Sequence, residues 1–427
     1  MKLWDKGFST DKKIDHFTVG NDRELDLLLA KYDVIASKAH AKMLGKIGLL
    51  TQKETKELVN ELDIIATKIN KGTFTIEPSF EDMHSKIEFM LTLSLGDTGK
   101  KIHTARSRND QVLVAMHLYL KDELTEIKSM TKTLFKLLLQ KAEKHKEVLL
   151  PGYTHLQIAM PSSFGLWFSA YAESLIDDLY FVEAAYKVVD QNPLGSAAGY
   201  GSSFDIDRSF TTKEMGFETM KYNVVAAQMS RGKAEKATAF GMANIAATLS
   251  KMAMDICLYM SQNFNFISFP DELTTGSSIM PHKKNPDVFE LVRGKCNKLQ
   301  SIPNQLTMVI NNLPSGYHRD LQLVKEIIVP AIQDMKACIE IMTFSLKEIR
   351  VNKDILEDPK YDYLFSVDTL NELVQNGMPF RDAYKKMGKE INEGTFTPKR
   401  DIHHTHEGSL GNLCLEEIWN KMKALDK

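Results

Sequence analysis

The chain has 427 residues, of which 43% are hydrophobic and 26% are charged, and its formal net charge is -2. A chain of this length exceeds one ordinary hydrophobic core, so we expect a globular protein of two or three domains. The near-neutral charge, without long runs of one sign, argues against a nucleic-acid or membrane surface. No apolar stretch reaches the roughly 18 residues that would predict a membrane-spanning helix.

The cysteines indicate the redox compartment. They are far apart and form no C-x-x-C pair, which is typical of reduced thiols in a cytoplasmic protein. The four positions are Cys257, Cys296, Cys338 and Cys414. Residues 1–9 also lack the apolar stretch of a secretion signal. We therefore expect a cytoplasmic location.

The first long segment without helix breakers covers residues 105–150, which contain neither Gly nor Pro. Its apolar residues recur at three- and four-residue spacings, a pattern that predicts an amphipathic helix. Members of this stripe include Leu113, Met116, Leu120, Leu124, Ile127 and Leu134. A helix of ~40 residues would be ~60 Å long, which is typical of a long bundle or coiled coil.

Further helices and two unusual loops follow along the chain. Helices are predicted over residues 163–189, 233–263 and 321–349, the last with a kink at Pro330. Strand signals are sparse. Residues 192–205 and 274–286 are polar connections too long for simple turns, and such loops frequently carry function.

The distribution of helices and loops predicts an all-α protein with three parts. The first is an N-terminal helical domain of residues 1–106. The second is a central bundle of long helices over residues 107–351, which includes both unusual loops. The third is a small C-terminal domain over residues 352–427.

The segment GSSIMPHKKNPD, residues 276–287, has the residue types of an anion-binding loop. Gly276 permits unusual backbone angles, two hydroxyls and two lysines follow, and Asn285 with Pro286 predicts the start of a helix over 287–299. That helix would direct its positive end at the loop, which favours an anion. Composition alone also fits a solvated loop in front of a capped helix.

The same segment matches the signature G-S-S-x-M-P-x-K-x-N, so the chain resembles the fumarase/aspartase superfamily and, within it, the argininosuccinate lyases. HTARSRNDQV (103–112), LPGYTHLQ (150–157) and LPSGYHRDLQLVKE (313–326) carry the closer resemblance. EDMHS (81–85) and GMPFRDAYK (377–385) agree with it. The resemblance covers nearly the whole chain in family order. It implies the all-α superfamily fold and a lyase that releases fumarate by breaking a carbon–nitrogen bond.

The implied reaction removes a proton beside a carboxylate and expels a guanidinium-type nitrogen, so it needs a base, an acid and concentrated positive charge. Ser277 matches the family's catalytic base, with Ser278 as the alternative register, and Lys283 would supply positive charge. His155 matches the histidine on the leaving-group side, and Glu290 the carboxylate that polarises it. The sequence leaves open which of serine and histidine is base and which is acid.

The resemblance also implies a set of substrate-binding residues. Arg108 and Asn109 match the family's contacting pair. Asn109 or Asp110 alternatively caps the long helix, and the two roles are compatible because a helix N-terminus binds carboxylates. The other implied positions are Asp22, Thr154, Arg231, Asn285, Tyr317, Gln322 and Lys325.

The chain departs from the family pattern in three places. LQIAMP stands at residues 156–161 where family members commonly have LQRAQP, and Asp22 stands where a family serine contacts substrate. The common Asp-x-x-Ser-Asp/Glu-Arg-Asp run appears as AAQMSRG at residues 226–232, followed by Lys233. Acids are lost and a base is gained around Arg231. The changes concern the arginine end of the substrate and leave the fumarate-forming end intact.

Two alternatives stay open. One is the same elimination on an N-acylated argininosuccinate or on adenylosuccinate. The acid loss near Ala226 favours the acylated version, because an acyl group removes the ammonium with which acids would pair. The second is a catalytically silent structural homologue, against which the intact Ser277, His155, Lys283 and Asn285 argue.

The C-terminal part carries His403, His404 and His406. Histidine is a common zinc ligand, but no Cys or His set with finger spacing accompanies them, and a surface or subunit contact is favoured. We expect no cofactor and no metal. The long apolar stripe exceeds what one subunit buries, which predicts a homotetramer, and the resemblance implies active sites shared between its subunits.

Overall fold

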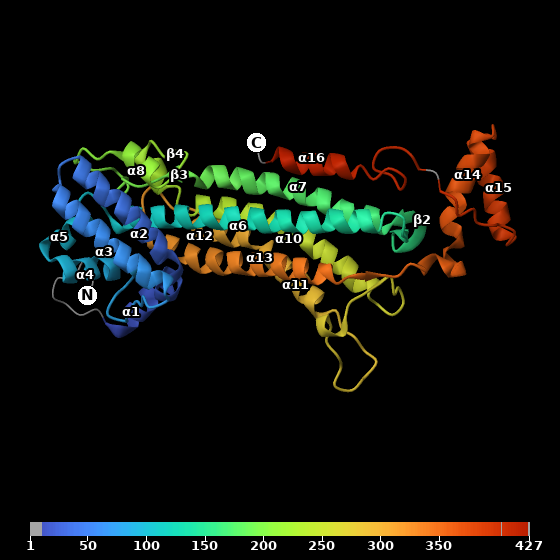
Figure 1. Ribbon diagram of the computed structural model, residues 1–427, viewed down its shortest axis with the longest axis horizontal. Helices are drawn as coiled ribbons and strands as arrows, with labels where there is room; N and C mark the ends of the chain where they lie inside the picture. The colour runs from blue at the N-terminus through green and yellow to red at the C-terminus, as the bar shows by residue number, and fades with distance from the viewer. Residues whose placement is uncertain (1–10, 403, 426–427) are drawn as a thin grey trace. The chain divides into compact units, whose positions relative to one another are not determined.

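The computed structural model describes residues 11–402 and 404–425. Long helices dominate it, and the all-α prediction is confirmed (Figure 1). The four long helices that the sequence predicts are α6 (Arg108–Lys144), α7 (Phe164–Val189), α10 (Lys233–Tyr259) and α13 (Leu323–Lys347). The predicted stripe of α6 is buried, since Leu113, Leu120 and Leu124 are at most 1% exposed. Residues 1–9, on which the expectation of no secretion signal rests, lie outside the described residues.

The first predicted long helix, α6, begins and ends inside the segment of residues 105–150 that lacks Gly and Pro. Ala105 has φ 62°, and Ser107 caps the helix by accepting from the backbone of Asn109 at 3.2 Å. Asp110 returns the bond, because its carboxylate accepts from the Ser107 amide at 3.0 Å. At the other end, residues after 148 leave the helix for an antiparallel hairpin of β1 (Leu149–Thr154) and β2 (Gln157–Ser163). The prediction of a helix of ~40 residues within this segment is confirmed, because α6 has 37 residues.

The chain divides into two compact units that each combine distant stretches. Unit 1 comprises the chain up to Lys128 together with Phe181–Asn244 and Lys298–Met335. Unit 2 comprises Ser129–Tyr180, Ile245–Asn297 and the chain from Lys336. The division into domains of residues 1–106, 107–351 and 352–427 stays a proposal.

Unit 1 contains the N-terminal helices, among which α2 packs against α3, α4 and α8. The helix α3 begins with a capping box, in which Thr51 and Glu54 exchange hydrogen bonds. A two-residue parallel pairing joins β3 (Gln191–Asn192) to β4 (Thr219–Met220). The other elements are α1 (Lys12–Val19), α2 (Asp22–Lys46), α3 (Gln52–Asn70), α4 (Met83–Leu95), α5 (Asp97–Lys100), η1 (Lys101–His103), α8 (Arg208–Glu214), α9 (Val224–Gln228), α12 (Ile302–Ile310) and η3 (Arg319–Gln322).

Unit 2 contains a cluster of aromatic side chains, two of which donate hydrogen bonds to the carboxylate of Asp255. Asp255 accepts from the Trp167 indole at 3.1 Å and from the Tyr171 hydroxyl at 2.6 Å, which satisfies both polar groups inside an apolar cluster. β5 (Ile267–Ser268) pairs antiparallel with β6 (Arg350–Val351). The remaining elements are η2 (Asp271–Leu273), α11 (Asp287–Leu299), η4 (Ile355–Glu357), η5 (Pro359–Phe365), α14 (Ser366–Gln375), α15 (Phe380–Asn392) and α16 (Leu415–Ala424).

None of the four cysteines, which all lie among the described residues, forms a disulfide. Within the part of the chain that the structure describes, no helix has both the length and the apolar character needed to cross a bilayer.

Candidate functional site

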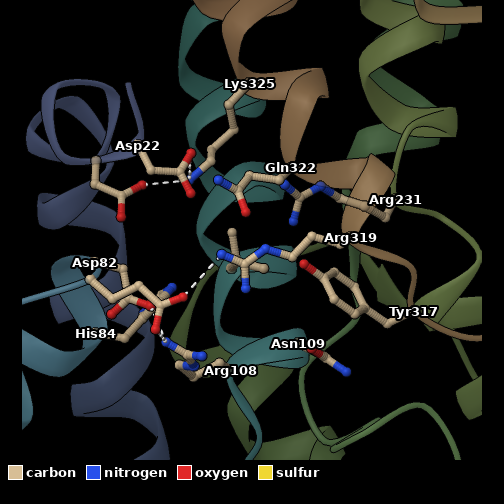
Figure 2. A pocket seen from close by; sticks show the side chains of 13 residues that line it. Asp22, Asp82, His84, Arg108, Asn109, Arg231, Tyr317, Arg319, Gln322 and Lys325 are labelled. Atoms are coloured by element: carbon tan, nitrogen blue, oxygen red, sulfur yellow. Dashed lines mark hydrogen bonds and ion pairs between the residues drawn. The ribbon is translucent and has the colours of Figure 1, made fainter. Parts of the chain in front are cut away.

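A polar cavity of about 100 Å³ lies in unit 1. It brings together every predicted binding residue except Thr154 and Asn285, although their positions in the sequence are as much as 300 residues apart. Figure 2 shows these side chains gathered in one region from several elements. The predicted residues in the lining are Asp22, Arg108, Asn109, Arg231, Tyr317, Gln322 and Lys325, and Asp26, Glu81, Asp82, His84, Val112 and Arg319 complete it.

Helix N-termini supply much of this lining. Asp22 and Asp26 lie in the first turns of α2, Asp82 caps α4, and Arg108 begins α6. The Asp82 carboxylate accepts from the Ser85 amide at 2.8 Å, as an N-cap does. Helix N-termini carry partial positive charge, so several favour a bound anion here.

Lys325 holds two acids of the cavity. Its ammonium lies 2.9 Å from Asp22 and 2.7 Å from Asp26. Burial alone would lower the pKa of Lys325, but Asp26 and Asp22 outweigh burial and raise that pKa above its ordinary value. Burial, assisted by Asp26, raises the pKa of Asp22. Lys325 is therefore charged at neutral pH, whereas the raised pKa of Asp22 makes its ionised form less favourable than that of an ordinary aspartate.

A second ion-pair group forms the opposite side of the cavity. The Arg108 guanidinium lies 3.0 Å from Glu81 and 2.7 Å from Asp82. Arg319 approaches the other oxygen of Glu81 at 3.1 Å (Figure 2). Arg319 also donates a hydrogen bond to the Thr18 carbonyl. Because Glu81 is buried and shared by two arginines, it fixes both guanidinium groups at the cavity.

Arg231 lacks the neighbouring acids of the family pattern, and its acidic partner is Glu235, one helical turn further along the chain. Its Nε lies 3.3 Å from Glu235, and its Nη2 donates to the Leu321 carbonyl at 3.1 Å. The other Glu235 oxygen accepts from the Gly232 amide at 2.7 Å. Burial raises the pKa of Glu235. The chain therefore retains a fixed Arg231 despite the lost aspartates.

The sequence prediction missed Asp26, Glu81, Asp82, His84 and Arg319 as cavity residues. Four of them stand in segments whose resemblance the sequence did show, EDMHS and GYHRD, so a signal was present. His84 lies 2.9 Å from Asp33, and this carboxylate outweighs burial to raise the pKa of His84.

His155 occupies the tip of the β1–β2 hairpin in unit 2. Thr154 pairs with Gln157, so His155 and Leu156 form a two-residue turn, and their φ angles are 54° and 58°. Positive φ at both positions is the geometry of a type I′ turn, which ordinarily selects Asn-Gly. The histidine is exposed, and among the described residues it makes no hydrogen bond, including to Glu290.

The loop of residues 274–286 also lies in unit 2. The Ser277 hydroxyl accepts from the amides of Ile279 and Met280 at 3.3 and 3.1 Å. The Lys283 side chain is exposed. Strong anchors are confined to the ends of the loop, where Thr275 and Asn285 pair through their backbones.

The start of the following helix corrects a prediction. α11 spans Asp287–Leu299 as expected, but the Glu290 amide donates to the Pro286 carbonyl at 3.0 Å, so Pro286 occupies the cap position. Asn285 instead pairs with Thr275 and donates from its side chain to the Gly276 carbonyl at 3.3 Å. The cap prediction for Asn285 was therefore wrong by one residue. Glu290 is exposed and lies 4.0 Å from Arg293.

The described C-terminal histidines have ordinary partners. His404 lies 2.6 Å from Asp368, and the His406 ring stacks near that of His404. His403 lies outside the described residues. Over residues 11–402 and 404–425, no group of three or more His, Cys, Asp or Glu side chains is arranged to hold a metal.

Comparison with known proteins identifies the family and the fold. The family model described as "Lyase" matches residues 7–301. EDDS lyase in complex with formate has a similar fold, with a TM-score of 0.80 at 20% identity, covering 98% of this chain and 91% of that one. A fumarate lyase described as delta crystallin, from Brucella melitensis, gives a TM-score of 0.72 at 18% identity, covering 98% and 93%. These matches define the class as lyases of the fumarase/aspartase type.

The relatives narrow the class. Argininosuccinate lyase of Bacteroides thetaiotaomicron is 57% identical over 418 residues, which are 98% of this chain and 94% of the relative. That of Thermotoga neapolitana is 42% identical over 389 residues, covering 91% and 98%. The chain belongs to the argininosuccinate lyase family.

Proposed function

We propose that this protein cleaves argininosuccinate to arginine and fumarate, a step of arginine biosynthesis. The observation that carries the proposal is the 57% identity to argininosuccinate lyases over nearly the whole chain. In the reaction a base takes a proton from the carbon beside a carboxylate of the succinate part. The electron pair forms the double bond of fumarate, the carbon–nitrogen bond breaks, and an acid protonates the departing nitrogen.

The charges of the unit 1 cavity support this substrate. Argininosuccinate has three carboxylates and a positively charged guanidinium group. Arg108, Arg319 and Arg231 suit the carboxylates, since guanidinium groups bind carboxylates with two parallel hydrogen bonds. Asp22 and Asp82 suit the guanidinium group. A site of one charge sign would not complement such a substrate.

The catalytic roles stay proposals carried by motif. Ser277 and His155 divide the work of base and acid, Lys283 stabilises the aci-carboxylate dianion, and Glu290 polarises His155. Thr154 and Asn285 complete the substrate contacts. The strained hairpin tip at His155 supports a functional role, because positive φ at a histidine costs free energy that a plain turn would avoid.

We further propose a homotetramer with shared active sites. Large apolar side chains remain exposed on the long helices, which supports burial against other subunits. Examples are Tyr180 at 53%, Phe240 at 50%, Met254 at 47% and Phe344 at 52% exposure. Light scattering measures the assembly, and a fully active monomer would refute it. A His155 variant mixed with a Ser277 variant should recover activity if subunits share sites.

The steady-state release of fumarate, followed by its ultraviolet absorbance, tests the reaction. We expect activity with argininosuccinate and none with adenylosuccinate, and activity that survives exhaustive chelation. Absence of fumarate release from argininosuccinate would contradict the proposal. We propose a cytoplasmic location, which is supported by four described cysteines that form no disulfide, and cell fractionation tests it.

A further inference from the structure

A second cavity of about 140 Å³ adjoins the first in unit 1, and Arg231 lines both. Its volume far exceeds the roughly 15 Å³ that one water needs, so it has room for a substituent of several atoms. Its walls are largely apolar, with Met229, Ile310 and Leu313. Among the described residues of its lining there is no acid, whereas the first cavity has four.

Gln228 in this lining is a buried polar side chain without a partner. It is 1% exposed, and its Oε1 has no hydrogen bond among the described residues. Buried acceptors are almost always satisfied, so this oxygen is available to accept from a donor that binds beside it. Gly199, with φ 116°, faces this side chain, and a Cβ there would come within 3.2 Å of it.

The charge of the second cavity is positive. Lys233 is exposed and has no ion pair among the residues that the structure describes. Arg231 is the second cation of this lining, although Glu235 balances it. A free α-ammonium would be repelled here, whereas a carbonyl or carboxylate would be attracted.

We propose that this second cavity holds an acyl group on the α-nitrogen of the arginine part, so that the protein also releases fumarate from N-acylated argininosuccinate. The inference rests on the proposed elimination. Arg231 would bind the α-carboxylate at the boundary between the cavities, which directs the substituent of the adjacent nitrogen into the second one. The amide N–H then donates to Gln228, and an acyl carboxylate reaches Lys233. The products are fumarate and N-acylarginine.

Three substrates test the proposal: argininosuccinate, N-acetylargininosuccinate and N-succinylargininosuccinate. We expect kcat/KM for at least one N-acyl substrate within tenfold of that for argininosuccinate, or above it. A loss of more than tenfold for both N-acyl substrates would overturn the proposal. Failure of all three to release fumarate would instead contradict the elimination itself.

Substitutions in the lining of the second cavity test whether the acyl group binds there. Gln228→Leu should lower the ratio of kcat/KM on the N-acyl substrate to that on argininosuccinate about tenfold, because the amide loses its acceptor. Lys233→Gln should lower this ratio for the N-succinyl substrate alone. Lys236→Gln, three residues along the same helix, is the matched control and should leave the ratio unchanged. An unchanged ratio in both folded test variants would rule out this cavity.

Discussion

Lys325 places its ammonium nitrogen 2.7 Å from a carboxylate oxygen of Asp26, and both side chains are almost fully buried. Asp22 shares the same cation. Removing the cation leaves two acids buried without a counter-charge. We therefore expect Lys325→Met to lower the free energy of unfolding by about 3–5 kcal/mol, measured by urea denaturation. Lys347→Met, at the exposed end of the same helix, should stay within ~0.5 kcal/mol. Equal effects of the two substitutions would disprove the buried-charge argument.

We expect the free energy of unfolding to depend on pH through the buried side chain of His117. It is 1% exposed and lies 2.8 Å from the Val189 carbonyl and 3.1 Å from the Ser230 hydroxyl. Burial lowers the pKa of His117 to about 4. In the unfolded chain the pKa is about 6.5, so between the two values the unfolded chain binds more protons, and the stability of the fold decreases as the pH falls from 6.5 towards 4.

The loss attributable to His117 is about 3 kcal/mol between pH 7 and pH 4. Denaturation of the wild type and of His117→Gln across this window measures it. The wild-type curve should be steeper by this amount, since glutamine has no proton to gain. Parallel curves would show that His117 titrates alike in both states.

A substitution at His155, at the tip of the β1–β2 hairpin, distinguishes its effect on turn stability from its effect on catalysis. Asn adopts positive φ more readily than His does, so His155→Asn should keep or slightly raise stability, by up to ~1 kcal/mol. The same variant loses the imidazole, so kcat should fall about 10²–10⁴-fold. Thermal unfolding and fumarate release measure the two effects. Near-normal turnover would remove His155 from the mechanism.

Local signals in the sequence were sufficient for some elements and not for others. The helix Asp287–Leu299 follows from proline and periodicity close at hand, and its bounds are as predicted. The hairpin after residue 148 depends on pairing between Leu149 and Ser163, and its His155-Leu156 turn lacks the usual Asn-Gly signal. Periodicity therefore predicted the preceding helix, but it gave no signal for the hairpin that follows.

The cavity in unit 1 also depends on contacts between residues that are distant in the sequence, which local patterns do not predict. The resemblance supplied single positions such as Lys325, but not the partner that determines its charge state. Asp26 is 299 positions away and meets Lys325 only through the packing of α2 near the start of α13. Arg319 was missed for the same reason, because its role comes from sharing Glu81 with Arg108.

Ser277 and Ser278 distinguish the two registers of the signature. We expect Ser277→Ala to lower kcat by orders of magnitude, because the proposed base is lost. The effect on folding should stay near or below ~1 kcal/mol, since the hydroxyl accepts only two long hydrogen bonds within its own loop. Ser278→Ala is the matched control and should retain most activity. The reverse outcome would move the base to Ser278.

The loop around Ser277 is expected to close over the substrate. In the structure, Ile279 is 85% exposed and Met280 41% exposed, so these apolar side chains do not anchor the loop. Closure would bring Lys283 toward a carboxylate and expel water, which strengthens each electrostatic contact. A ligand with two carboxylates should therefore be needed to hold the closed form.

Hydrogen exchange across residues 275–284 measures this closure. Fumarate should slow exchange of these amides, whereas crotonate, which has the same double bond and one carboxylate, should slow it much less. The α11 amides beyond the first turn provide an internal reference, because their hydrogen bonds exist in both states. Equal protection of the loop with and without fumarate would mean that no closure occurs, and Ser277 would then have to be activated in a preformed site.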